Sequence, residues 1–106
     1  MTESEFLDRV AAVWREIETR VDQWAQSLDA EIEANPAGPV LELDFASGRQ
    51  IVVNAQTPMR QVWLASPRGA WHFQWTGETW RDTRSDADLW SVLTEQAAIE
   101  SGAPLS

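Results

Sequence analysis

The most informative stretch of this 106-residue sequence is NAQTPMRQVWLASP, residues 54–67. Pro58 fixes φ and has no backbone N–H to donate, so a strand can begin only after it. Beyond Pro58, Val62 and Leu64 point to one face of the expected strand and Trp63 points to the other, because side chains alternate along a strand. Two aliphatic residues suffice for a buried face. Trp63 is therefore either covered by another segment or part of a contact surface, and the local pattern supports both readings equally.

Alternating apolar and polar residues on both sides of this stretch predict further strands. Turns rich in proline, glycine and serine separate them, notably at 35–39 and 46–48. The expected strands cover residues 29–33, 40–45, 49–54, 61–65, 71–75 and 80–83. The side chains expected to face the core from two of these strands are Leu41, Leu43 and Phe45, and Trp71, Phe73 and Trp75.

Apolar residues three and four positions apart predict one helix near each end of the chain. Ser4 is the expected N-cap of the first helix and Ser85 that of the second, and Gly102 and Pro104 should end the second. The first apolar stripe consists of Phe6, Val10, Val13, Trp14, Ile17, Val21, Trp24 and Leu28. The second consists of Leu89, Trp90, Leu93 and Ala97, with Val92 as a further candidate.

The order helix, five or six antiparallel strands, helix predicts an α+β fold in a single domain over residues 1–106. We expect a two-layer sandwich with both helices on one face of the sheet. The other face of the sheet would then be open to water and would carry Trp63.

The composition excludes several classes of site. Cysteine is absent and His72 is the only histidine, so disulfides, thiolate metal sites and sites built on several imidazoles are ruled out. No apolar run approaches the ~20 residues of a membrane span, and the acidic N-terminus is unlike a signal or transit peptide. We therefore expect a cytoplasmic protein without a membrane partner. No nucleophile–base pair or phosphate-binding loop is apparent, so we expect neither an enzyme nor an organic cofactor.

The negative charge is concentrated in the first part of the chain. Residues 1–44 hold eleven acids and three arginines, a net of −8, whereas residues 45–106 hold six acids and five arginines, a net of −1. Nucleic acid is therefore an unsuitable partner, while cations or a basic protein surface are suitable ones. The acids that share one flank of the first helix are Glu18 and Asp22, and those on the outer face of the next strand are Asp29, Glu31 and Glu33.

These five carboxylates predict an open acidic ridge. Oxygen-only ligands attract hard cations such as Fe²⁺, and an open, hydrated ridge should bind them weakly. Two other interpretations stay open: a solvated helix flank, and an edge strand whose charges block unwanted pairing.

Two motifs carry a resemblance to a known family. They are N-x-QTP-x-x-QVWL-x-SP over residues 54–67 and WTG-x-x-W over residues 75–80. With the order of elements along the whole chain, they make it similar to the frataxin family, and the short N-terminus resembles the bacterial (CyaY-type) members.

The resemblance implies a frataxin-like fold and a function. Frataxins bind iron weakly through an acidic ridge, and they bind the cysteine desulfurase and scaffold protein of iron–sulfur cluster assembly and modulate its rate. On this sequence the ridge positions are Glu18, Asp22, Asp29, Glu31 and Glu33, and the partner-facing positions are Asn54, Gln61 and Trp63. We expect a monomer that acts as regulator or adaptor.

The chain also departs from the family pattern. Thr19, Gln23 and Ala25 stand where bacterial members often have further acids, so we expect fewer or weaker iron sites. Two alternatives belong to other classes. One is a weak ferroxidase or iron chaperone that uses the ridge, and the other is an acidic interaction module without physiological metal binding.

Overall fold

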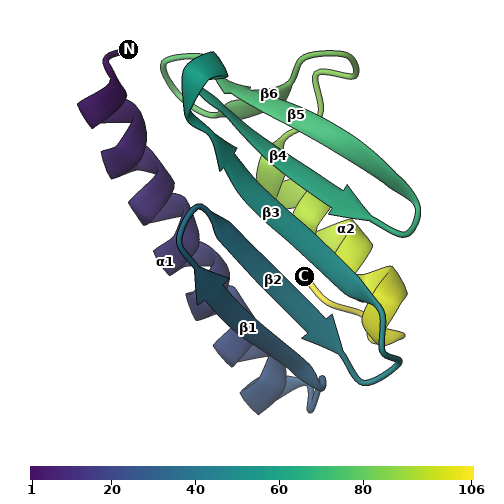
Figure 1. Ribbon diagram of the computed structural model, residues 1–106. Coiled ribbons are helices and arrows are strands. Elements are labelled where there is room, and N and C mark those ends of the chain that lie inside the picture. Colours follow the sequence, from purple (N-terminus) through teal and green to yellow (C-terminus); the bar gives the residue numbers. More distant parts are fainter.

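A six-stranded antiparallel sheet forms one layer of the computed structural model, which describes residues 1–106 (Figure 1). Each strand pairs with the next one along the chain, in the order β1-β2-β3-β4-β5-β6. The strands are β1 (Ile32–Ala37), β2 (Val40–Phe45), β3 (Gln50–Gln56), β4 (Gln61–Ser66), β5 (Gly69–Trp75) and β6 (Trp80–Asp82). A short 3-10 helix, η1 (Thr57–Met59), carries Pro58 between β3 and β4, as expected for a residue that cannot donate to the sheet.

Two helices, α1 (Glu3–Ser27) and α2 (Leu89–Ser101), form the second layer on one face of this sheet (Figure 1). The α+β two-layer sandwich predicted from the sequence is confirmed. The core lies between the layers and contains 22 buried apolar residues. The strand residues with no exposed surface include Leu41, Leu43, Ile51, Val53, Val62, Leu64 and Phe73. Neither helix is long and apolar enough to cross a membrane.

The first helix begins earlier than predicted. Its N-cap is Thr2, not Ser4. The Thr2 hydroxyl accepts a hydrogen bond from the backbone N–H of Glu5 at 3.1 Å, and the Glu5 carboxylate accepts one from the backbone N–H of Thr2 at 3.4 Å. This reciprocal capping box satisfies two backbone donors at once, an advantage that Ser4 lacks.

The second helix begins later than predicted. Its N-cap is Asp88, which accepts hydrogen bonds from the backbone N–H groups of Trp90 and Ser91, and the prediction of Ser85 is wrong. The Ser85 hydroxyl instead donates to the carboxylate of Asp82 at 2.8 Å. Ser85 therefore binds the neighbouring buried carboxylate of Asp82 and is not the helix cap that the local pattern predicts. The predicted end at Gly102 is confirmed, since Gly102 is the C-cap with φ +70°.

The strand predicted at residues 29–33 begins only at Ile32 and continues to Ala37. Asp29 has a left-handed backbone conformation, with φ +53°, which interrupts any strand there. The turn predicted at residues 35–39 consists only of Gly38 and Pro39, because the preceding residues, Pro36 included, belong to β1. β1 is an edge strand, where a missing N–H costs no hydrogen bond of the sheet.

The aromatic face predicted for residues 71–75 is confirmed in part. Phe73 is completely buried, whereas Trp71 and Trp75 are half-buried and pack against the edge of the core. The opposite face of β5 carries His72, as the alternation predicts.

Candidate functional site on the outer face of the sheet

The face of the sheet opposite the helices carries the strand side chains that alternate with the buried core residues. The strand register places these side chains in rows that run across the sheet. One row joins Asn54 on β3, Trp63 on β4 and His72 on β5, each directly opposite the next. We call this face the outer face. It contains all three partner-facing positions predicted from the sequence.

Trp63 is neither covered by a helix nor isolated. Its indole stacks on the imidazole of His72, with the ring centroids 4.0 Å apart and the planes within 8° of parallel. The indole Nε1–H donates a hydrogen bond to the Gln61 side-chain oxygen at 2.9 Å. Both contacts come from outer-face neighbours and leave the ring half-buried. Trp63 is therefore a flat apolar group held in one orientation on an open surface. Its predicted placement on the open face is confirmed, and its role in partner binding stays a prediction.

Amide side chains border the stacked pair. Asn54 accepts a hydrogen bond from the side-chain amide of Gln56 at 2.6 Å. Gln56, Gln61 and Gln74 form a second row across β3, β4 and β5. Amides both donate and accept hydrogen bonds, so this part of the surface can match a polar partner backbone without carrying charge.

Asp82 fixes the backbone beneath His72. One carboxylate oxygen accepts from the backbone N–H of His72 at 2.8 Å, and the other accepts from Ser85 and Arg84. Burial alone would raise the pKa of the Asp82 carboxyl. The hydrogen bonds that it accepts, foremost those from Ser85, outweigh burial and hold that pKa below its usual value. The ionised carboxylate thus ties the edge of β5 to the loop before α2. Sequence reasoning did not identify this role.

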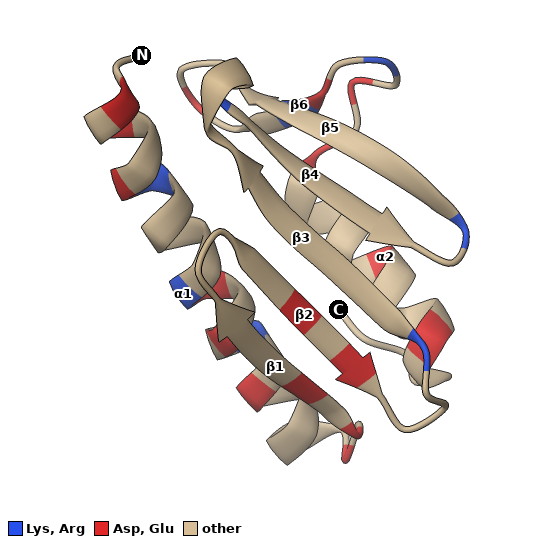
Figure 2. Ribbon diagram, in the orientation of Figure 1, with Lys and Arg blue, Asp and Glu red and all other residues tan.

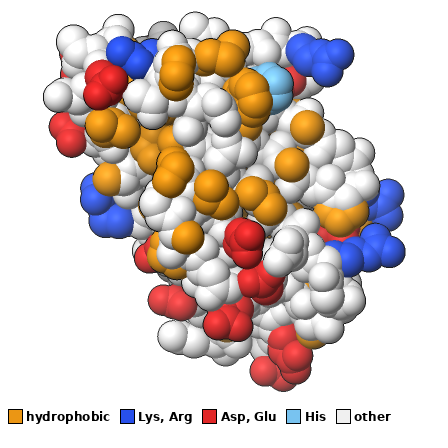
Figure 3. All heavy atoms as spheres, in the orientation of Figure 1, with side chains coloured by type: hydrophobic (Ala, Val, Ile, Leu, Met, Phe, Trp, Pro, Cys, Tyr) orange, Lys and Arg blue, Asp and Glu red, His pale blue; other side chains and the backbone are white.

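Acidic residues are concentrated on β1 and β2, at one side of the sheet (Figure 2). Glu33 on β1 lies directly opposite Asp44 on β2. The Asp44 carboxylate accepts hydrogen bonds from the side-chain amides of Asn35 at 2.5 Å and Gln50 at 2.7 Å. Like charges directly opposite each other destabilise a sheet, and the two amides only partly offset that cost. Figure 3 shows acidic side chains gathered over this part of the face and hydrophobic ones over the rest.

Sequence reasoning missed Glu42 and Asp44 as members of this surface. Both point to the outer face, because the residues that alternate with them, Leu41 and Leu43, are completely buried. The alternation in residues 40–45 contained this signal, since it assigned the inward residues correctly.

The five predicted ridge acids do not converge on one point. Glu18, Asp22 and Glu33 line one shallow groove between α1 and β1. Glu31 and Glu33 line a second groove with Asp44. Asp29 lies apart with Glu31, in a third hollow near the end of α2. No group of three or more aspartate, glutamate or histidine side chains is arranged to hold a metal ion. The ridge is therefore an extended negative surface and not a closed ligand cage.

Comparisons with known proteins find similar sequences and a similar fold. A family profile described as "Frataxin-like domain" matches residues 1–103. The "Iron-sulfur cluster assembly protein CyaY" of Bordetella parapertussis is 42% identical over 106 residues, covering 100% of this chain and 97% of that protein. The protein of the same name from Janthinobacterium sp. is 39% identical over 106 residues, covering 99% of this chain and 95% of that protein. The solved frataxin of Psychromonas ingrahamii superposes with a TM-score of 0.81 at 24% identity, over 100% of this chain and 97% of that one.

Proposed function

The chain belongs to the frataxin family, and from that membership we propose that it is an iron-binding adaptor that regulates iron–sulfur cluster assembly in the cytoplasm. Its partners would be the cysteine desulfurase and the scaffold protein of that machinery. The chain itself would bind and modulate, without a catalytic step of its own. Relatives at 39–42% identity that bear the name of this process support the assignment.

One observation carries the proposal: the outer face combines a charged region with a fixed aromatic anchor. The acids of β1 and β2 share one continuous sheet surface with the Trp63–His72 stack of β4 and β5, and β3 separates the two groups. Long-range charge attraction would steer a basic partner toward β1 and β2. The indole of Trp63, already held by His72 and Gln61, would then lose little conformational entropy when the partner covers it. Preorganised aromatic groups of this kind are typical binding hot spots.

Calorimetric titration with a purified cysteine desulfurase tests the anchor. Trp63→Ala should weaken binding by about 30-fold, since hot-spot truncation costs about 2 kcal/mol or more. Ile99→Ala is the matched control, because Ile99 is an exposed apolar residue, 40% exposed, on α2 in the other layer. Equal affinity of Trp63→Ala and the parent protein would defeat the proposal.

The charged region is tested in the same titration. Asp44→Asn should weaken binding several-fold at low salt and less at high salt, because exposed charges are screened. Glu95→Gln removes the same charge from the exposed surface of α2 and should leave the affinity unchanged. If both variants lost the same affinity, only the net charge would matter and the acidic region would have no specific role.

Iron would bind the ridge as a weakly held cargo. The carboxylates do not enclose an ion, so any bound Fe²⁺ would keep much of its water. The groove with Glu18, Asp22 and Glu33 contains three of the five predicted ligands, whereas each of the other two grooves contains two. A cation there would lower the negative charge that meets a basic partner, so cation and partner should weaken each other's binding reciprocally.

The dispersal of the acids favours one second candidate, an acidic interaction module that binds no metal physiologically. Amide chemical-shift mapping with Fe²⁺ separates the two. Shifts confined to Glu18, Asp22 and residues 29–33 support iron binding at the ridge. Shifts spread evenly over all exposed acids, Glu78 and Glu95 included, favour the metal-free module.

A further inference from the structure

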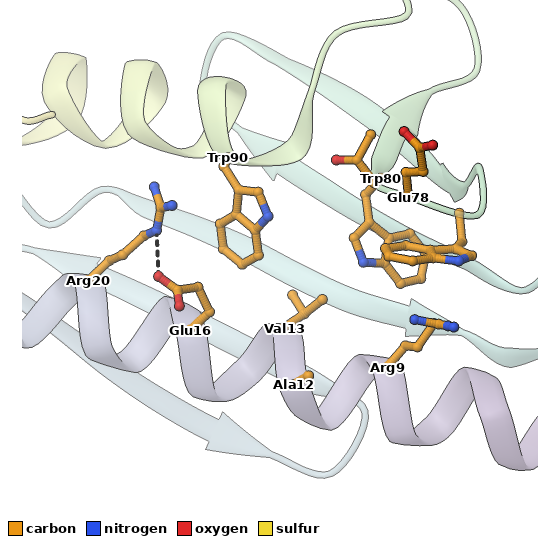
Figure 4. Close-up of a pocket in the computed structure, with 10 residues that line it drawn as sticks. Arg9, Ala12, Val13, Glu16, Arg20, Glu78, Trp80 and Trp90 are labelled. Carbon is orange, nitrogen blue, oxygen red and sulfur yellow. Dashed lines mark hydrogen bonds and ion pairs between the residues drawn. The ribbon is translucent and has the colours of Figure 1, made fainter.

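A further hollow lies on the helix side of the sheet, away from the outer face. It runs along α1, beneath the start of α2 and the turn between β5 and β6, and has a volume of about 420 Å³. That volume is within the usual range for small-molecule sites. Figure 4 shows Trp90 and Trp80 above α1, with Val13 and Ala12 between them on the helix. We call this hollow the tryptophan groove.

An arginine from α1 stacks on a tryptophan at each end of the groove. The guanidinium carbon of Arg9 lies 4.2 Å from the centroid of a Trp75 ring, and that of Arg20 lies 4.7 Å from a Trp90 ring. Cation–π contacts of this kind hold a guanidinium in a defined plane. They also occupy ring faces that a cationic ligand would need, so a cationic ligand is disfavoured.

The two arginines differ in what else they contact. Arg20 donates its Nε–H to Glu16 at 2.9 Å and is thereby partly neutralised. Arg9 forms neither an ion pair nor a side-chain hydrogen bond, so all five of its N–H donors are available. In a chain with a net charge of −9, this is a positive group held flat against the wall of a hollow.

The remaining walls suit a flat apolar group. Trp80 is buried and packs edge-on against Trp75, with centroids 5.5 Å apart and planes at 64°. Ala12 and Val13 offer only methyl groups toward the space between Trp80 and Trp90. Because Trp80 is only 3% exposed, a planar ring would contact mainly the indole of Trp90, with the small accessible part of Trp80 on its other side and the methyl group of Ala12 beneath it.

We propose that the tryptophan groove binds a planar aromatic molecule that carries a single negative group. The ring lies between Trp80 and Trp90, and the negative group accepts hydrogen bonds from Arg9. Glu16 and Glu78 also line the groove, and Glu5 and Asp8 flank Arg9 on its other side. These four acids repel highly charged ligands, which selects a monoanion such as an aromatic carboxylate over a nucleotide with several phosphate charges.

The probe is 2-naphthoate, a rigid bicyclic carboxylate, added to ¹⁵N-labelled protein. The indole N–H signals of Trp75, Trp80 and Trp90 should shift in a saturable manner. The indole N–H of Trp63 is the internal control and should not move, because Trp63 lies on the opposite face of the sheet. Unchanged signals at all three groove tryptophans up to millimolar probe, or an equal shift of Trp63, would overturn the proposal.

Variants and a neutral probe separate the anion contact from ring stacking. Arg9→Gln should weaken 2-naphthoate binding about fivefold, equivalent to ~1 kcal/mol, and should leave binding of the uncharged 2-naphthamide unchanged. Arg15→Gln removes the same charge from an exposed position of α1 outside the groove and should have no effect. Ala12→Phe should fill the space and abolish binding of both probes. Equal losses in Arg9→Gln and Arg15→Gln would contradict the assigned role of Arg9.

Discussion

Replacing Asp82 by asparagine tests the buried hydrogen-bond network that supports the outer face. Asparagine has the shape of aspartate and keeps one oxygen for the backbone N–H of His72. Its amide nitrogen cannot accept the three hydrogen bonds that the other carboxylate oxygen now accepts, two from Ser85 at 2.8 Å and one from Arg84 at 3.3 Å. The variant therefore removes the acceptor for the β6–α2 loop and leaves the β5 contact.

The expected loss of stability follows from those contacts. A hydrogen bond to a charged group contributes about 1.5–3 kcal/mol. Most of the expected loss comes from the two bonds that Ser85 donates at 2.8 Å. Ser85 and Arg84 are exposed, so water satisfies the released donors and reduces the loss. We expect a decrease of about 2–3 kcal/mol in the free energy of unfolding and a fall in Tm of roughly 10–20 °C.

The pH dependence gives an independent readout of the same group. The pKa of Asp82 in the folded state lies below its unfolded value, so the unfolded chain binds more protons between those two values. The stabilisation from Asp82 is therefore complete above the unfolded value of about 4 and is lost as the pH falls through the folded pKa. The difference between parent and Asp82→Asn should shrink below about pH 4.

Urea unfolding followed by tryptophan fluorescence, repeated between about pH 3 and pH 7, measures both effects. Asp86→Asn is the control, because Asp86 is exposed and its backbone φ of +62° suits asparagine equally well. It should change stability by less than about 0.5 kcal/mol. A loss in Asp82→Asn no larger than that of the control, or a constant difference at all pH values, would refute this account of the network.

Three further predictions concern charge and the chain end. Glu33→Gln removes the like-charge pair with Asp44, so it should raise the free energy of unfolding by up to about 0.5 kcal/mol at low salt and by nothing near ~1 M salt; a gain that persists in salt would contradict the electrostatic cause. Leu105→Ala should lower the free energy of unfolding by about 1.5–3 kcal/mol, because Leu105 is buried near the chain end. An unchanged Tm would show that this end of the chain does not stay packed against the core. Glu100→Leu should raise the free energy of unfolding by about 1 kcal/mol, because one oxygen of the buried Glu100 carboxylate has no partner and the other has only Arg49, which is 62% exposed and can return to water. If urea unfolding gave a lower free energy of unfolding for this variant, the ion pair would be net stabilising.

The parts of the fold that depend on local periodicity could be predicted from the sequence. The alternation in residues 40–45 assigned the buried side chains of β2 correctly, because a strand with one buried face repeats every two residues. Pro58 marked the break before β4, and Gly102 marked the end of α2, because each residue has a backbone property that few others share. These signals are contained in the local sequence.

The two N-cap predictions failed because several nearby side chains and backbone groups can form the hydrogen bonds that a cap needs. Ser4 and Ser85 are both suitable caps, but Thr2 gains a reciprocal bond with Glu5, and Ser85 is held by Asp82 across a turn. A sequence pattern lists the candidates and does not rank them, because the ranking depends on which acceptor the fold brings close.

The candidate site also has features that the local sequence predicts and features that depend on how the elements pack together. Trp63 and Glu33, the single acid within β1, could be placed on the outer face from alternation alone. The stack between Trp63 and His72 depends on the register of β4 and β5, which the separate strands do not reveal. The tryptophan groove depends on the position of α1 relative to β5 and α2, so the contacts of Arg9 and Arg20 had no signal in the sequence.

Amide chemical-shift mapping of the ¹⁵N-labelled chain with unlabelled cysteine desulfurase tests the proposed contact most directly. If the outer face is the binding surface, the largest changes fall on the outward residues of β1 to β5, centred on Asn54, Trp63 and His72, while the exposed residues of α2 keep their positions. Changes centred on α2, with β3 and β4 unaffected, would show that the partner binds the helix layer and would contradict the proposal.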